Sequence, residues 1–180
     1  ENNLEPLIKK TLAIFDVSKV YELGFAGNII RKSILKGNIP PTIEKEIRES
    51  YLELSTKYGS QNSDVAVRSS STAEDLPNAS FAGQQETFLN INSADDLIEN
   101  IKKCYASLFT NRAISYRETM GFDHMEALIS VGIQKMVRTD KSTSGVAFSI
   151  DTESGFKDVV LINACYGLGE LLVQGAITPD

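Results

Sequence analysis

Between Val65 and Thr87 the chain carries residues whose types and spacing suit the binding of phosphate oxygens. The small apolar run VAV is typical of the end of a short buried strand, and Arg68 follows it directly. A guanidinium group presents a planar fork of donors that can hold two oxygens at once. Hydroxyl and backbone N–H donors of a tight loop can supply the rest, and the residues that follow are Ser69, Ser70, Ser71 and Thr72.

The same segment is also typical of an ordinary surface loop, because it is rich in serine and contains a proline. Gly83 fits the phosphate interpretation, since a residue without Cβ lets the backbone approach a ligand closely. The sequence contains neither G-x-x-x-x-G-K-[ST] nor G-x-G-x-x-G, two common phosphate-binding motifs. Any nucleotide site in this chain therefore belongs to another architecture.

Three blocks of sequence resemble the phosphoenolpyruvate synthase family, within the larger pyruvate phosphate dikinase N-terminal group. The run VRSSSTAEDLPNASFAG, residues 67–83, is similar to the long signature of that family. IQKMVRTDKSTSGVAFSID, residues 133–151, resembles its adenine-side hinge and the hairpin after it. LINACYGLGELLVQGAITPD, residues 161–180, resembles the strand and loop that follow. The blocks occur in family order, whereas residues 1–64 match only as helices.

The resemblance implies an ATP-grasp nucleotide-binding domain that works with ATP and Mg²⁺. In that family the domain phosphorylates a histidine on a separate swivelling domain, and a third domain then makes phosphoenolpyruvate from pyruvate. The expected partners are therefore ATP and the phosphohistidine and pyruvate-binding domains of the same full-length chain. By the same resemblance, Arg68 would contact the ATP phosphates as the catalytic residue, while Gly83 and Thr87 would line the phosphate loop.

The resemblance also implies an adenine site. Gln134 would lie at the adenine hinge, together with the backbone of Met136 and Val137. Apolar side chains at this hinge would suit an adenine ring, although the same residues also fit a plain core strand. Glu170 follows the turn GLG. It would either approach the nucleotide ribose or a metal shell, or cap the helix that follows, where acidic residues are favoured.

Several functional groups of the family have no counterpart in this sequence. Its ATP-contacting lysine, in a G-G-K segment, precedes the region matched here, and its metal-binding glutamate and Q-x-R pair come after the last matched block. Phosphoryl transfer depends on positioning and on neutralising charge with Mg²⁺ and basic groups. We therefore assign no metal ligand in this chain and expect the chain by itself to be inactive.

Two other functions remain open at this point. The signature is shared with rifampin phosphotransferases, which would keep the nucleotide site but change the acceptor. A catalytically silent nucleotide-binding or interaction module could be built on the same scaffold. Apolar surface left by missing parts of the domain would favour self-association into a homo-oligomer.

Composition excludes several classes of protein. The 180 residues are 42% apolar, which predicts a buried core, and the net charge of −6 argues against a nucleic-acid binder. No apolar run approaches the length of a membrane span, and no signal peptide is recognisable, so we expect a cytoplasmic protein. Cys104 and Cys165 lack metal-ligand spacing and are expected to be reduced, buried thiols, with a disulfide as the alternative. His124 is expected to be a surface residue in a connecting loop.

The apolar spacing predicts an α+β fold, helical first and mostly antiparallel later. Helices are expected through most of residues 1–58, one of them capped by Thr42, and Ser93 and Asp96 form a capping box for a later helix. The other elements expected are a strand at 87–91, a helix at 111–120, and strands at 128–137, 145–150 and 158–163, the first two of these paired as a hairpin. The domain expected is an ATP-grasp-like fragment with a helix-rich lobe, 1–125, holding the phosphate signature at 65–87, and a strand-rich lobe, 126–180.

Overall fold

The computed structural model describes residues 2–71, 75–76, 79–80 and 86–178. It divides into two compact units, Glu1–Met136 and Val137–Asp180, and each is described by itself. Helices and antiparallel strands are both present, which confirms the α+β class. In the part of the chain that the structure describes, no helix is long and apolar enough to cross a membrane.

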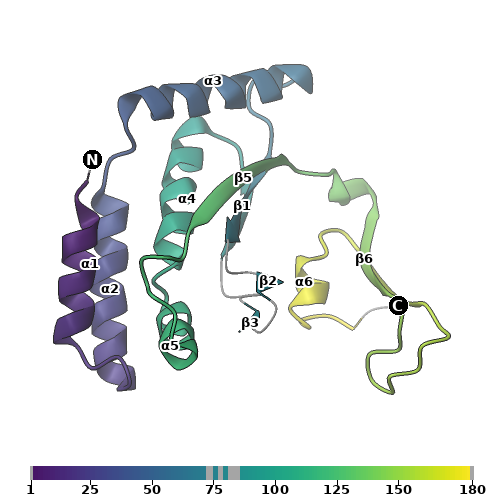
Figure 1. The fold of residues 1–180 in the computed structure, drawn as a ribbon. Coiled ribbons are helices and arrows are strands. Elements are labelled where there is room, and N and C mark those ends of the chain that lie inside the picture. The colour runs from purple at the N-terminus through teal and green to yellow at the C-terminus, as the bar shows by residue number, and fades with distance from the viewer. Residues whose placement is uncertain (1, 72–74, 77–78, 81–85, 179–180) are drawn as a thin grey trace. The chain divides into compact units, whose positions relative to one another are not determined.

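The described residues of the first unit form five helices (Figure 1). They are α1 (Leu4–Ile14), α2 (Val20–Lys36), α3 (Pro41–Lys57), α4 (Ala94–Ser107) and α5 (Asn111–Met120). The first three confirm the helices expected before residue 58. One apolar cluster, in which Ile8, Ile30 and Ile114 are buried, joins α1, α2 and α5. Each fully buried side chain of this size contributes about 1.5–3 kcal/mol relative to an exposed one.

Local capping signals define the ends of two helices. The Asp96 backbone N–H donates to the Ser93 hydroxyl oxygen at 3.1 Å, and that hydroxyl donates to the Asp96 carboxylate at 2.7 Å. This confirms the capping box that opens α4. Gly121 closes α5 with φ +69°, a left-handed conformation that glycine adopts without a Cβ penalty.

The cap expected at Thr42 was wrong. Helix α3 begins one residue earlier, at Pro41, with Pro40 in the capping position and no side-chain capping bond. A proline in the first turn loses nothing by lacking an N–H, because that donor has no partner within the helix. The pair Pro40–Pro41 therefore starts this helix.

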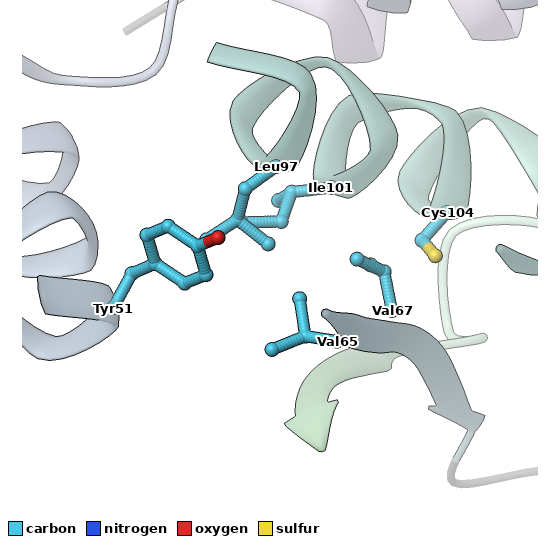
Figure 2. Packing of buried hydrophobic residues seen from close by; sticks show 6 residues of the cluster. All are labelled: Tyr51, Val65, Val67, Leu97, Ile101 and Cys104. Carbon is cyan, nitrogen blue, oxygen red and sulfur yellow. The ribbon is translucent and has the colours of Figure 1, made fainter. Parts of the chain in front are cut away.

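A three-stranded antiparallel sheet completes the first unit. Its strands are β1 (Val65–Ser71), β4 (Thr87–Ile91) and β5 (Ile129–Lys135), in the order β4-β1-β5. Figure 2 shows Val65 and Val67 of β1 facing Leu97, Ile101 and Cys104 of α4, with Tyr51 of α3 closing the cluster. The sheet therefore has one face buried against α4.

A bulge in β4 keeps two apolar residues on the buried face. Val65 pairs with Ile91 and Val67 pairs with Phe88, so β4 contains one extra residue between these positions. Asn90 takes up the extra length with φ +58°, a left-handed conformation that asparagine tolerates better than most residues. Phe88 and Ile91 both pack on the core cluster although they are three residues apart.

Two strand predictions are corrected. Strand β1 does not end at Arg68 but continues to Ser71, because residues up to Ser71 pair with β5 as far as Ile129. The strand expected at 145–150 does not pair with β5. The central strand β1 pairs with β5 instead, so the hairpin expected from adjacency in sequence does not form.

The remaining strands form two small ladders. β2 (Asp75–Leu76) pairs with β3 (Ala79–Ser80) over two residues. In the second unit β6 (Thr143–Phe148) pairs with β7 (Leu161–Tyr166), after the short 3₁₀ helix η1 (Thr139–Lys141), and α6 (Glu170–Val173) follows. A Cβ at Gly145 would lie 2.4 Å from the Asn163 carbonyl oxygen, so the β6–β7 approach requires glycine there.

Candidate functional site

The sheet of the first unit has a second face, opposite α4, which we call the polar face. Burial alternates along β5, with Val131 and Ile133 packed on the core, so the residues between them point the other way. The polar face is defined here by residues of all three strands: Arg68 of β1, Thr87 of β4, and Ser130, Gly132 and Gln134 of β5.

Arg68 lies at the centre of the polar face. Its register partners are Thr87 on one side and Gly132 on the other. The side chain is exposed, and its Nη1 donates to the Gln134 amide oxygen at 3.1 Å. Among the side chains that the structure describes, no carboxylate lies within ion-pair distance of this guanidinium. Because the guanidinium is exposed, an anionic ligand can reach it.

Three of the predicted site residues thus come together although they are far apart in sequence. Arg68 and Thr87 are directly opposite across two strands, and Gln134 reaches Arg68 from the third. Side chains directly opposite in an antiparallel pair have Cβ atoms about 4.5–5.5 Å apart, so one ligand group can contact both. Gly83, the other residue expected to line the phosphate loop, lies outside the described residues.

Two hydroxyl side chains near Arg68 donate to the backbone. The Ser69 hydroxyl donates to the Glu86 carbonyl at 3.4 Å, and the Ser130 hydroxyl donates to the Ser70 carbonyl at 3.3 Å. Both donor–acceptor distances are long for O–H donors, which prefer about 2.7–2.8 Å. The arginine is accordingly the principal donor that this face offers to an anion.

The predicted hinge residues lie at the boundary of the two units. Met136 ends the first unit and Val137 begins the second. The Met136 N–H donates to the Asp64 carbonyl at 2.9 Å, and the Met136 carbonyl accepts from Lys135 Nζ at 3.0 Å. The Val137 side chain is 75% exposed. In this structure both backbone groups of Met136 therefore have partners within the chain.

Glu170 is the first residue of α6, in the second unit. Its carboxylate is exposed and accepts a hydrogen bond from the Gln174 amide nitrogen at 3.1 Å. Gly167, with φ +83°, provides the turn before this helix. The carboxylate is thus placed at a helix start, while its proposed approach to a nucleotide stays a prediction.

A charged cluster around Arg117 was missed by sequence reasoning. Arg117 is fully buried, its Nε donates to His124 Nδ1 at 2.9 Å, and its Nη2 donates to the Leu108 carbonyl. Loss of solvation lowers the pKa of this guanidinium to about 10. His124 Nε2 lies 2.8 Å from the Glu118 carboxylate, which places the proton of a neutral ring on Nε2.

The expectation that His124 is a surface residue was therefore wrong. Its side chain is only 12% exposed, because it bridges a buried arginine and a carboxylate. The spacing of Arg117 and Glu118 before His124 was the available signal, but it acquires meaning only when the chain turns back after α5. The cluster joins α5 to the loop after it and has a structural role.

The two cysteines agree with the sequence prediction. Cys104 and Cys165 are free and buried. Burial is the main reason that the pKa of the Cys104 thiol rises to about 11, and the nearby Glu86 carboxylate adds to the rise. Cys104 therefore behaves as an apolar core residue rather than as a nucleophile.

An apolar cavity of about 330 Å³ lies among α1, α2, α3 and α4. Its lining includes Ile8, Ile34, Ile47 and Tyr105, and it shares no residue with the polar face. The ammonium group of Lys102, at this cavity, already donates to the Leu35 carbonyl at 3.0 Å. A phosphate-bearing ligand needs several donors, so the polar face is the better candidate site.

Comparison with known protein families decides the class of this chain. The family model described as "Pyruvate phosphate dikinase, AMP/ATP-binding domain" matches residues 1–180. The chain belongs to this family. The arginine of the polar face therefore lies in an AMP/ATP-binding domain.

Curated relatives agree with the family match. The chain is 56% identical over 179 residues to a phosphoenolpyruvate synthase of Aquifex aeolicus, covering 99% of this chain and 21% of that protein. It is 52% identical to the enzyme of the same name from Synechocystis, over 100% of this chain and 22% of that protein. The Escherichia coli phosphoenolpyruvate synthase is 52% identical, over 92% and 21% respectively. The chain thus spans about a fifth of the length of these relatives.

Proposed function

We propose that the polar face binds the phosphates of ATP, with Arg68 as the principal contact. The observation that carries this proposal is the exposed guanidinium at the centre of the face, in a chain that belongs to an AMP/ATP-binding family. Thr87 lies directly across from it and can add a hydroxyl donor. Charge-assisted contacts from arginine to phosphate are short and strong, and the fork can hold two oxygens.

The proposal includes an ATP-grasp-like architecture in which the remaining predicted residues complete the nucleotide site. Gly83 would allow close approach to the phosphates, and Met136 and Val137 would contact the adenine. Glu170 would approach the ribose or a bound Mg²⁺. Among the described residues no group of three His, Cys, Asp or Glu side chains could hold a metal ion. Besides any contact from Glu170, the Mg²⁺ of Mg-ATP would take its ligands from the triphosphate and from other parts of the full-length protein.

The activity proposed for the full-length protein is that of a pyruvate, water dikinase. The relatives that cover this chain are named phosphoenolpyruvate synthase, which favours pyruvate chemistry over antibiotic phosphorylation. The chain would bind Mg-ATP while a histidine on another domain of the same polypeptide accepts the phosphoryl group. Pyruvate would bind to a further domain. The chain alone would supply nucleotide binding without turnover.

Substitution of Arg68 tests the phosphate role. In the full-length protein, Arg68→Ala should weaken ATP binding, measured by titration calorimetry, by roughly 10- to 100-fold, because a hydrogen bond from a charged group contributes about 1.5–3 kcal/mol. Arg68→Lys should recover part of the loss, since it keeps the charge without the fork. Arg112→Ala, an exposed arginine on α5, is the matched control. Unchanged ATP affinity in Arg68→Ala would refute the proposal.

A further inference from the structure

The contact between Gln134 and Arg68 crosses from one strand to the next. Gln134 is opposite Ala66 in the β1–β5 register, and Arg68 is opposite Gly132, so the two side chains are diagonal neighbours on the polar face. Diagonal neighbours in a sheet are about 7–8 Å apart, within reach of long side chains. The Arg68 Nη1–Gln134 Oε1 hydrogen bond, 3.1 Å long, uses this reach.

The residue opposite Arg68 on β5 is Gly132, so no β5 side chain stands directly across from the arginine. An exposed arginine otherwise samples many rotamers, and freedom lost on binding a ligand weakens the complex. A partner that holds one nitrogen in the free protein removes part of that loss.

The amide group of Gln134 also affects how much of the Arg68 charge remains. An amide oxygen is a neutral acceptor, so it orients the guanidinium without offsetting its charge, as a carboxylate would. Arginine has five N–H donors, and one accepted bond leaves the others for phosphate oxygens. The geometry is therefore that of an arginine oriented by a neutral acceptor, with no carboxylate among the described side chains to offset its charge.

We infer that Gln134 is a positioning residue, which orients the Arg68 guanidinium for the phosphates of the nucleotide. This inference rests on the proposed function of the polar face, and it gives the Gln134 side chain a role at the phosphate end. It predicts that Gln134 acts through Arg68. Direct reading of the adenine by the Gln134 side chain would predict independent effects.

A double-mutant cycle in the full-length protein separates these two roles. Gln134→Leu should weaken ATP binding about 5- to 10-fold, the size expected for one hydrogen bond, and should leave adenosine binding unchanged. When Arg68 is already alanine, the same substitution should have less than about a 2-fold effect on ATP binding. Gln134→Glu keeps an acceptor but offsets the charge, so it should weaken ATP binding at least as much as Gln134→Leu.

Gln61→Leu is the matched control. Gln61 is an exposed glutamine in the segment between α3 and β1, outside the polar face, so ATP binding should not change. Equal loss of adenosine and ATP affinity in Gln134→Leu, or additive effects with Arg68→Ala, would overturn the inference. If Gln134→Leu has no effect while Arg68→Ala does, the inference fails and the proposed function stands. If Arg68→Ala itself has no effect, the proposed function fails.

Discussion

The two compact units differ in how they bury apolar surface. In the first, Glu1–Met136, two apolar clusters join five helices and a three-stranded sheet. In the second, Val137–Asp180, Cys165 is the one buried hydrophobic side chain among the described residues, while Ile162 is 64% and Tyr166 85% exposed. A two-stranded sheet by itself is marginally stable in water. The comparison indicates that the first unit holds nearly all of the folding free energy of this chain.

The largest difference in the free energy of unfolding should come from truncating one apolar side chain in each unit. Leu97→Ala removes a side chain with no exposed surface from the α4 cluster, and we expect it to lower the free energy of unfolding by about 2–5 kcal/mol. Ile162→Ala, on β7, should cost less than about 0.5 kcal/mol, as surface substitutions generally do. Urea unfolding followed by circular dichroism measures both. Equal losses would show that the contrast between the units is wrong.

Two glycines, one in each sheet, give the next largest contrast. A Cβ at Gly145 would collide with the Asn163 carbonyl, whereas a Cβ at Gly132 would lie 3.8 Å from the Arg68 carbonyl, an ordinary contact. We expect Gly145→Ala to destabilise the β6–β7 pair by about 1–3 kcal/mol and Gly132→Ala to cost less than about 1 kcal/mol. Amide hydrogen exchange should accelerate in β6 and β7 of Gly145→Ala alone. Unchanged exchange rates in β6 and β7 would show that the added Cβ does not destabilise this pair of strands.

Alkaline pH should weaken the first unit through Cys104. Because burial raises the pKa of this thiol to about 11, the folded protein keeps a proton that the unfolded chain loses above about pH 9. The stability contribution is present below pH 9 and is lost as the pH rises toward 11, on the order of 2 kcal/mol in total. Urea unfolding at pH 8 and pH 10.5 should show a larger decrease for the natural chain than for Cys104→Ala. Parallel decreases would exclude Cys104 as the cause.

The smallest effect concerns a helix cap. Ser93→Ala removes the acceptor for the Asp96 N–H at the start of α4, and we expect a loss of about 1 kcal/mol. Ser93→Asp, which keeps a capping oxygen, is the matched control and should retain most of the stability. Thermal unfolding of the three proteins provides the test. A loss as large in Ser93→Asp as in Ser93→Ala would assign the effect to something other than capping.

Local signals predicted much of the first unit. The capping box at Ser93, the strand at 87–91 and the end of α5 at Gly121 agree with the structure because each depends on residues within one or two turns of the chain. Predictions that needed a distant partner failed. Sequence adjacency suggested that β5 pairs with the next strand, but the buried strand β1, about sixty residues earlier, is its partner.

The candidate site shows the same division. Arg68, Thr87 and Gln134 could be selected from the sequence by their chemistry and by the family resemblance. Their placement on one face, and the contact between Gln134 and Arg68, follow from the order of strands β4, β1 and β5. The surface environment expected for His124 was wrong for a related reason, because its partner Arg117 becomes a neighbour only when the chain turns back after α5.

By itself the sequence determined the helices, the capping box of α4, the end of α5, the family and the residues whose chemistry suits phosphate, because these depend on residue type and short-range spacing. Tertiary structure alone decided which strands pair, and therefore that Arg68 lies in mid-strand with an amide partner on one side and a hydroxyl on the other. The physical reason is that strand pairing is set by the burial of a whole sheet face against α4, a property that no single segment contains.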